Sequence, residues 1–151
     1  MSKETTWASS TWLLLHSLTI KMNNNLFLKE KNNILSLFYD ICTNLPCPTC
    51  SAHAKHVMKE YNFMKISNIS QLKDFMFNFH NHVNKSIGKK IEDESVLEKY
   101  NNVRFHLVIH NFIRLYPKSF DPGLNLTISS QLHRRKITNR LINWLKQNLK
   151  R

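Results

Sequence analysis

Helix-breaking residues are scarce in this chain, which has only two glycines and four prolines among 151 residues. Rossmann and P-loop enzymes need glycine clusters where the backbone meets phosphate, and β-sandwiches need many turn residues. Both classes are therefore disfavoured, and Pro/Gly-rich low-complexity chains are excluded. Because a helix interior tolerates glycine and proline least, their scarcity predicts an all-α protein.

The spacing of apolar residues predicts four helices, over residues 6–22, 27–44, 48–60 and 71–87. We expect Ser70 to cap the start of the fourth helix and Gly88 to follow its end. Amphipathic helices with short connections favour a four-helix bundle, and 42% hydrophobic residues suffice for its core. A short fifth helix is expected near residues 93–100.

The rest of the chain reads as a basic helical C-terminal extension, which divides the chain into residues 1–102 and 103–151. Residues 103–115 are expected to be helical, and Pro117, Pro122 and Gly123 to form a linker. Residues 129–150 predict a long amphipathic helix that packs its apolar face on the bundle or on a second subunit. That face consists of Leu132, Ile137, Leu141, Leu145 and Leu149.

The formal charge of +12 belongs mostly to this extension. Residues 1–102 hold 12 basic and 9 acidic residues, whereas residues 103–151 hold 10 basic residues and one acid. Such a segment indicates a nucleic acid, a membrane surface or an acidic partner, or simply a solvated helix face. No apolar run approaches the ~20 residues of a membrane span, and the N-terminus shows no signal-peptide pattern. We therefore expect no membrane contact.

Two of the three cysteines, Cys47 and Cys50, are spaced as C-x-x-C, and Pro48 suits the first position of a helix. A helix N-terminus stabilises a thiolate, which is the nucleophile of disulfide exchange. This favours a redox pair with Cys47 reachable and Cys50 shielded, against the alternative of ordinary buried thiols. Cys42 is expected to be a core residue, with an interchain or third redox role as the weaker reading.

A zinc site is the competing interpretation of the same segment. The pattern C-x2-C-x2-H-x2-H, formed with His53 and His56, contains zinc ligand types. Zinc sites usually draw their two ligand pairs from separate elements, whereas these four residues share one loop and two helical turns. Tetrahedral closure is therefore strained, and we predict no metal.

A second group of residues suits a planar cofactor. Trp12 and His16 are four residues apart and hence adjacent on a helix, and His80, Asn81 and Asn84 lie within about one turn. Packed between helices, such side chains form either a satisfied polar core or the site of a cofactor with an aromatic ring and a phosphate, which Lys89 would bind.

In three motifs the chain resembles the ERV/ALR family of FAD-linked sulfhydryl oxidases, and especially the short forms carried by large DNA viruses. The resemblance covers about residues 5–100. The motifs are Trp12-Leu-Leu-Leu-His16, Pro46-Cys47-Pro-Thr-Cys50 and His80-Asn81-His-Val83-Asn84-Lys-Ser-Ile-Gly88-Lys89.

The resemblance implies an enzyme that oxidises thiols. It implies a four-helix bundle with a short fifth helix and FAD at its mouth. Cys50 would be the flavin-proximal cysteine, whose thiolate forms a charge-transfer pair with the flavin, and Cys47 would exchange with substrate. Electrons would pass to dioxygen and give hydrogen peroxide. The FAD-contacting positions implied by the resemblance are Trp12, His16, His53, His80, Asn81, Val83, Asn84, Lys89 and Tyr100.

The resemblance also implies partners. These are a dithiol protein or a C-x-x-C relay protein, since the chain has no second cysteine pair, and a second copy that forms a homodimer through the first two helices. The expected location is the cytoplasm of a host cell or the virion. The family pattern does not account for residues 103–151, and nucleic-acid binding through this tail is the less favoured alternative function.

Overall fold

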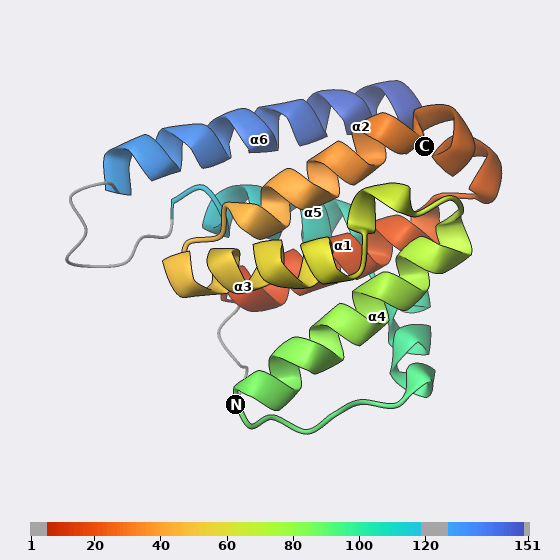
Figure 1. Ribbon diagram of the computed structural model, residues 1–151. Coiled ribbons are helices and arrows are strands. Elements are labelled where there is room, and N and C mark those ends of the chain that lie inside the picture. Colours follow the sequence, from red (N-terminus) through yellow and green to blue (C-terminus); the bar gives the residue numbers. More distant parts are fainter. Residues whose placement is uncertain (1–5, 119–126, 150–151) are drawn as a thin grey trace.

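The computed structural model describes residues 6–118 and 127–149. Figure 1 shows the arrangement of their helices, and no strand occurs in these two ranges, so the all-α prediction is confirmed. The elements are α1 (Trp7–Lys21), α2 (Asn24–Thr43), α3 (Pro48–Glu60), the 3₁₀ helix η1 (Phe63–Lys65), α4 (Ile69–Ser86), the 3₁₀ helix η2 (Glu94–Asn102), α5 (Phe105–Leu115) and α6 (Thr127–Asn148).

Asparagine caps account for the largest differences from the predicted helix boundaries. The side chain of Asn23 accepts from the backbone N–H of Leu26 at 2.8 Å, and α2 therefore begins three residues earlier than predicted. Asn68 caps α4 by accepting from the N–H of Gln71 at 2.9 Å, so the expectation for Ser70 was wrong. Gly88 follows α4 with φ = +77°, as expected for a glycine beyond a helix end.

One continuous apolar core joins all six α-helices. α1 packs against α4, α5 and η2, while α2 packs against α3, α4 and α6. The buried cluster includes Leu14 and Phe38 from α1 and α2, and also Phe112 and Leu141 from α5 and α6. Within the two described ranges, no helix is long and apolar enough to cross a membrane.

The long basic helix α6 runs along α2 (Figure 1). Its predicted packing on the bundle is confirmed at Ile137, Leu141 and Leu145, which are all buried, whereas Leu132 is 53% exposed. Leu132 precedes Ile137 by five residues, which places it about 140° around the helix axis and away from the core. The expected linker residues Pro122 and Gly123 lie outside the described ranges.

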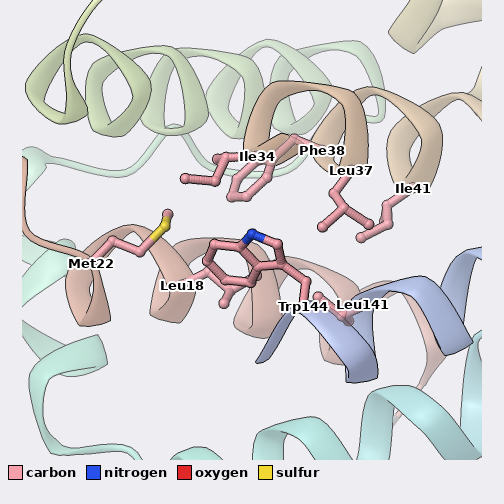
Figure 2. A pocket seen from close by; sticks show the side chains of 8 residues that line it. All are labelled: Leu18, Met22, Ile34, Leu37, Phe38, Ile41, Leu141 and Trp144. Carbon is pink, nitrogen blue, oxygen red and sulfur yellow. The ribbon is translucent and has the colours of Figure 1, made fainter. Parts of the chain in front are cut away.

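Trp144 anchors α6 between the first two helices. Figure 2 shows its indole among side chains of α1 and α2, including Leu18, Met22 and Phe38. The indole Nε1 donates to Oε1 of Glu30 at 3.1 Å, at the point where α2 departs from helical geometry. The extension therefore contributes to the core rather than projecting from it.

Candidate redox and cofactor site

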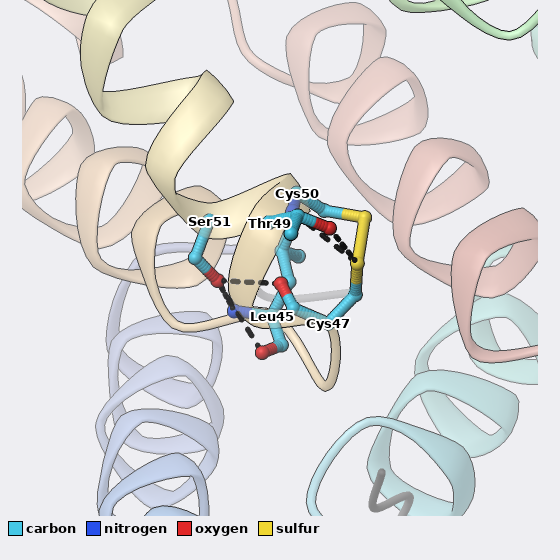
Figure 3. Close-up of a disulfide and its surroundings, with 5 residues drawn as sticks. All are labelled: Leu45, Cys47, Thr49, Cys50 and Ser51. Atoms are coloured by element: carbon cyan, nitrogen blue, oxygen red, sulfur yellow. Dashed lines mark hydrogen bonds between the residues drawn. A yellow bond between two sulfur atoms is a disulfide. The ribbon is translucent and has the colours of Figure 1, made fainter.

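The two cysteines of the C-x-x-C motif lie at the start of α3 and are joined in a disulfide (Figure 3). Cys47 is the N-cap residue, and its Sγ accepts from the backbone N–H of Cys50 at 3.2 Å. Pro48 occupies the first helical position, as expected. Both cysteines are half-buried, and Cys50 lies in the first turn of α3.

Ser51 holds the turn that precedes the disulfide. Its hydroxyl accepts from the backbone N–H of Leu45 at 2.8 Å, and it lies within donating distance of two carbonyl oxygens, those of Cys47 (3.2 Å) and Leu45 (3.3 Å). Figure 3 shows these bonds closing the loop onto the first turn of α3. The position of Cys47 is therefore tied to the helix on which Cys50 lies.

Cys42 is a free thiol within the core of the bundle. Its side chain is 2% exposed, and burial raises the pKa of the thiol to about 12. Because the thiolate is the reactive species, this cysteine is inert near neutral pH.

Four of the predicted cofactor residues form a cluster of flat rings where α1, α4 and η2 meet. The ring of His80 stacks on Trp12 with centroids 4.0 Å apart, and the ring of His16 stacks on Tyr100 at 4.6 Å. Nε2 of His16 lies 3.0 Å from Nδ1 of His80, so the two imidazoles share one hydrogen bond. The structure thus brings together residues separated by up to 88 positions in the sequence.

Both imidazoles of this cluster are neutral at neutral pH. Burial, followed by the neighbouring charges of His80 and Lys99, lowers the pKa of His16 to about 3. Burial, followed by Lys99 and Lys89, lowers the pKa of His80 to about 4. Burial also raises the pKa of Tyr100 to about 12, with a further contribution from Glu92. The cluster therefore offers uncharged rings with both donor and acceptor nitrogens.

The two asparagines shape the segment that follows α4. The amide of Asn81 donates to the carbonyl of Glu92 and accepts from its backbone N–H, both at 2.9 Å. The carbonyl oxygen of Asn84, a buried residue, accepts from the N–H of Lys89 at 2.8 Å. Val83 packs against the core. One small pocket is lined by His16, Phe77, His80, Asn81, Asn84, Glu92, Lys99 and Tyr100.

Lys99 and Glu92 also line this pocket, and the sequence interpretation named neither of them. Lys99 lies beside Tyr100, with its Nζ 5.1 Å from the ring centroid, and adjacency to an expected site residue was the available signal. Two hydrogen bonds between the backbone of Glu92 and the side chain of Asn81 place Glu92 at the pocket. No sequence pattern predicts these bonds.

His53 contacts His82 instead of the four-ring cluster. Its Nε2 is 3.1 Å from Nδ1 of His82, which ties α3, one turn beyond Cys50, to α4, two residues beyond His80. His56 pairs instead with Glu60 at 3.0 Å. In the part of the chain that the structure describes, no group of three or more His, Cys, Asp or Glu side chains is arranged to hold a metal ion.

The chemistry of this donor set fits a flavin dinucleotide. Trp12, His80 and Tyr100 offer flat faces for ring stacking, the amides of Asn81 and Asn84 suit ring heteroatoms, and lysines such as Lys99 suit a phosphate. An all-α scaffold has no glycine-rich phosphate loop, so side chains must do this work.

Comparison with known proteins supports the same assignment. The model of the Erv1 / Alr family matches residues 9–106. A putative FAD-linked sulfhydryl oxidase, 096R, of Invertebrate iridescent virus 3 is 29% identical over 96 residues, which are 62% of this chain and 65% of that protein. The FAD-linked sulfhydryl oxidase of African swine fever virus (isolate Tick/Malawi/Lil 20-1/1983) is 31% identical over 85 residues, 56% of this chain and 71% of the relative.

A more distant relative is the probable FAD-linked sulfhydryl oxidase FPV093 of Fowlpox virus (strain NVSL), which is 25% identical over 77 residues, 51% of this chain and 77% of that protein. The chain thus spans just under two thirds of the iridescent virus protein and more of the other two. No solved structure matches it.

Proposed function

Because the chain belongs to the Erv1/Alr family, we propose that it is an FAD-linked sulfhydryl oxidase, an enzyme that forms disulfides in thiol substrates. The observation that carries this proposal is the Cys47–Cys50 disulfide at the start of α3, tied through His53 and His82 to the helix that bears His80. A redox-active pair and a set of rings suited to a flavin thus belong to one bundle.

Cys47 and Cys50 carry the thiol chemistry in this proposal. A substrate thiolate attacks Sγ of Cys47, which forms a mixed disulfide, breaks the Cys47–Cys50 bond and releases the Cys50 thiolate. The substrate's second thiolate then attacks its own sulfur in the mixed disulfide, which gives the substrate disulfide and a Cys47 thiolate. The positive N-terminal end of α3 stabilises the negative charge on Cys50.

FAD, if bound, would supply a two-electron acceptor for the dithiol and a route for these electrons to dioxygen, with hydrogen peroxide as the product. We propose that the residues that hold it are Trp12, His16, His53, His80, Asn81, Val83, Asn84, Lys89 and Tyr100, to which Lys99 is added. The lowered pKa values of His16 and His80 mean that both rings are neutral, and one nitrogen of each is used in the bond between them. Of the two remaining nitrogens, one is an N–H donor and the other an acceptor for a polar ring edge.

Oxygen uptake tests this activity. The purified chain supplied with FAD should consume oxygen and release hydrogen peroxide when dithiothreitol is added, and Cys50→Ala should reduce the rate to that of free FAD. Tyr39→Phe, a half-buried position of α2 outside the proposed cysteine and cofactor sites, serves as the matched control and should retain the rate. A folded, FAD-loaded chain that consumes no oxygen contradicts the proposal.

The substrate is proposed to reach Cys47 directly or through a small relay protein with its own C-x-x-C. This follows from the cysteine inventory, since Cys42 is buried and no second pair exists among the three cysteines of the chain. In a Cys50→Ala variant the free Cys47 thiolate should attack the disulfide of the oxidised partner, form a mixed disulfide with it and release the partner's second thiol. Mass spectrometry of this adduct would identify the partner.

A homodimer through the first two helices also remains a proposal. In this chain α5 packs on α1 and α6 packs on α2, so a second copy would have to use the sides of α1 and α2 that these helices leave free. Sedimentation of the purified chain distinguishes a dimer from a monomer.

We further propose the cytoplasm of a host cell or the virion as the place of action. The relatives named above belong to viruses. Cytosolic thiols are kept reduced, so a virus that needs disulfides there gains from an oxidase of its own.

A further inference from the structure

The C-terminal end of α2 leads through residues 44–46 to Cys47. It is held by a residue that lies beyond residues 9–106, the part of the chain that the family model matches. Tyr116, directly after α5, is fully buried, and its hydroxyl lies 2.8 Å from the carbonyl oxygen of Asn44 and 3.1 Å from that of Ile41. The phenol has one hydrogen, and both carbonyl oxygens lie within its donating distance. Ile41 is among the last residues of α2, whose carbonyls have no partner within the helix, and Asn44 is its C-cap residue.

Helix α6 in turn holds Tyr116 in place. The guanidinium Nε of Arg134 donates to the carbonyl oxygen of Tyr116 at 3.0 Å, although the Arg134 side chain is only 4% exposed. Burying a guanidinium is costly unless hydrogen bonds satisfy it. Arrangements that break the bond from Arg134 to Tyr116 are therefore unfavourable, and the bond fixes the position of the Tyr116 backbone. The ring of Phe112 stacks on the Tyr116 ring at 4.7 Å, which fixes the phenol from the other side.

A second contact between α6 and α2 reinforces the same end. The side chain of Asn44 donates to the carbonyl oxygen of Asp40 at 2.8 Å, and the Asp40 carboxylate pairs with Arg140 of α6 at 2.8 Å. The end of α2 is therefore tied to α5 by Tyr116 and to α6 by Arg140.

Only Leu45 and Pro46 separate Asn44 from Cys47, and neither is free to move. Pro46 is buried and has a fixed φ, and Leu45 donates to the Ser51 hydroxyl of α3. The position at which Tyr116 holds Asn44 is therefore passed on to Cys47 through two constrained residues.

From these contacts we propose that Tyr116 is a positioning residue for the Cys47–Cys50 pair, and that it favours the disulfide over the dithiol. The inference rests on the proposed function in that the pair must cycle between these two forms. The structure holds the loop in the conformation that the disulfide requires. Reduction lets the two sulfurs separate, and a loop freed from Tyr116 gains more conformations in the dithiol form than in the disulfide form.

The test is an anaerobic titration of the full, FAD-loaded chain in glutathione buffers. In this equilibrium the Cys47–Cys50 disulfide and two glutathione thiols interconvert with the protein dithiol and one glutathione disulfide. Alkylation after acid quenching and unfolding, read by mass spectrometry, distinguishes the disulfide form, with one adduct on Cys42, from the dithiol form, with three.

Tyr116→Phe removes only the hydroxyl. We expect it to shift this equilibrium at least threefold toward the dithiol, which corresponds to about 14 mV at 29.6 mV per tenfold change. Tyr39→Phe, which removes a phenol from α2 itself, is the control and should leave the equilibrium unchanged. An unchanged equilibrium in Tyr116→Phe overturns the inference, even if the variant unfolds at a lower temperature, because a merely structural residue would affect both redox forms equally.

The experiment also distinguishes a folding defect of the variant, and a failure of the proposed function, from a failure of the positioning role. If Tyr116→Phe does not fold, as judged by circular dichroism, Arg134→Lys replaces it, and a shift toward the dithiol of at least about twofold is expected there, with no shift again overturning the inference. If the wild-type chain consumes no oxygen while its disulfide equilibrium still responds to Tyr116→Phe, the proposed function fails and the positioning role stands.

Discussion

Two imidazole rings, those of His16 and His80, face each other at hydrogen-bonding distance between α1 and α4. Trp12 covers one ring and Tyr100 the other, so water has little access to either. Burial and the nearby lysines make the charged forms unfavourable, and the pair therefore stays neutral well below neutral pH. Because the folded state resists protonation of this pair, its stability should depend on pH in the acidic range.

We expect the apoprotein to lose stability as the pH falls from 6.5 toward 4. The unfolded chain takes up protons at the ordinary histidine pKa of 6.5, whereas the folded chain binds them only near the lowered pKa values of about 4 and about 3. The unfolded state thus binds more protons in this window, and its free energy falls relative to that of the folded state. Above pH 6.5 the pair contributes no pH dependence.

Urea unfolding at several pH values between 7.5 and 4.5 measures this effect. His80→Asn should flatten the dependence, whereas His110→Asn, on the exposed side of α5, should leave it as in the wild type. A free energy of unfolding that stays constant from pH 6.5 to 4.5 in the wild type would show that the pair titrates normally.

Cys42 should be dispensable for the chemistry. Its thiol is buried and its pKa is raised to about 12, so it should not react with a thiol reagent in the folded chain. Cys42→Ala should keep full oxidase activity and lose roughly 1 kcal/mol of stability from the small cavity left behind. Oxygen uptake and urea unfolding measure the two quantities, and loss of activity in a folded Cys42→Ala chain would assign this cysteine a redox role.

At the level of single residues, the sequence predicts which side chains are neighbours within one helix, but it does not predict contacts between helices. Trp12 with His16, and His80 with Asn84, are recognisable because fixed helical offsets put them on one side. The stacking of His16 on Tyr100 and the bond between His53 and His82 depend on how helices pack, which one sequence does not reveal.

Among the elements, α6 makes the most specific packing contacts with the first two helices. Trp144 fills the space between α1 and α2 and donates a hydrogen bond to Glu30 (Figure 2). Trp144→Ala should lower the free energy of unfolding by about 3 kcal/mol or more, because it leaves a large cavity and an unpaired carboxylate.

Leu132→Ala is the matched control on the same helix. Leu132 is 53% exposed, and a change of about 0.5 kcal/mol or less is expected. Equal effects of the two substitutions in urea unfolding would mean that α6 does not pack on α2 as described.

The helices themselves followed from apolar spacing, and their ends followed from local chemistry only in part. Pro48 and Gly88 were identified correctly because each has one dominant positional preference. Asn68 and Ser70 are both good caps two residues apart, and the choice between them is settled by Ile69, which packs in the core and whose N–H donates to Asn24. Such a tertiary contact is outside the reach of a local pattern.

For the molecule as a whole, the basic extension is part of the structural core. Arg135, Lys136, Arg140 and Lys146 are exposed, Arg134 is buried, and the apolar side of α6 joins the same cluster as α1 and α2. The charge that dominates the composition therefore lies on the outside of an element that the bundle needs.

A chain shortened after Lys118 should be unstable. Without α6, apolar side chains of α1 and α2 such as Leu18, Met22 and Ile34 lose their cover, and a large exposed apolar patch promotes aggregation. Thermal unfolding and binding of a hydrophobic dye compare the shortened and full chains. Equal melting temperatures and no added dye binding would show that α6 contributes nothing to the fold.

The visible absorption spectrum of the purified chain during anaerobic addition of dithiothreitol tests directly whether this protein holds a flavin that the Cys47–Cys50 pair reduces. We predict that the chain carries the absorption bands of oxidised flavin, and that dithiothreitol bleaches them in the wild type but far more slowly in Cys50→Ala. A colourless, folded chain that does not take up added FAD, or flavin bands that bleach equally fast in Cys50→Ala, would contradict the account.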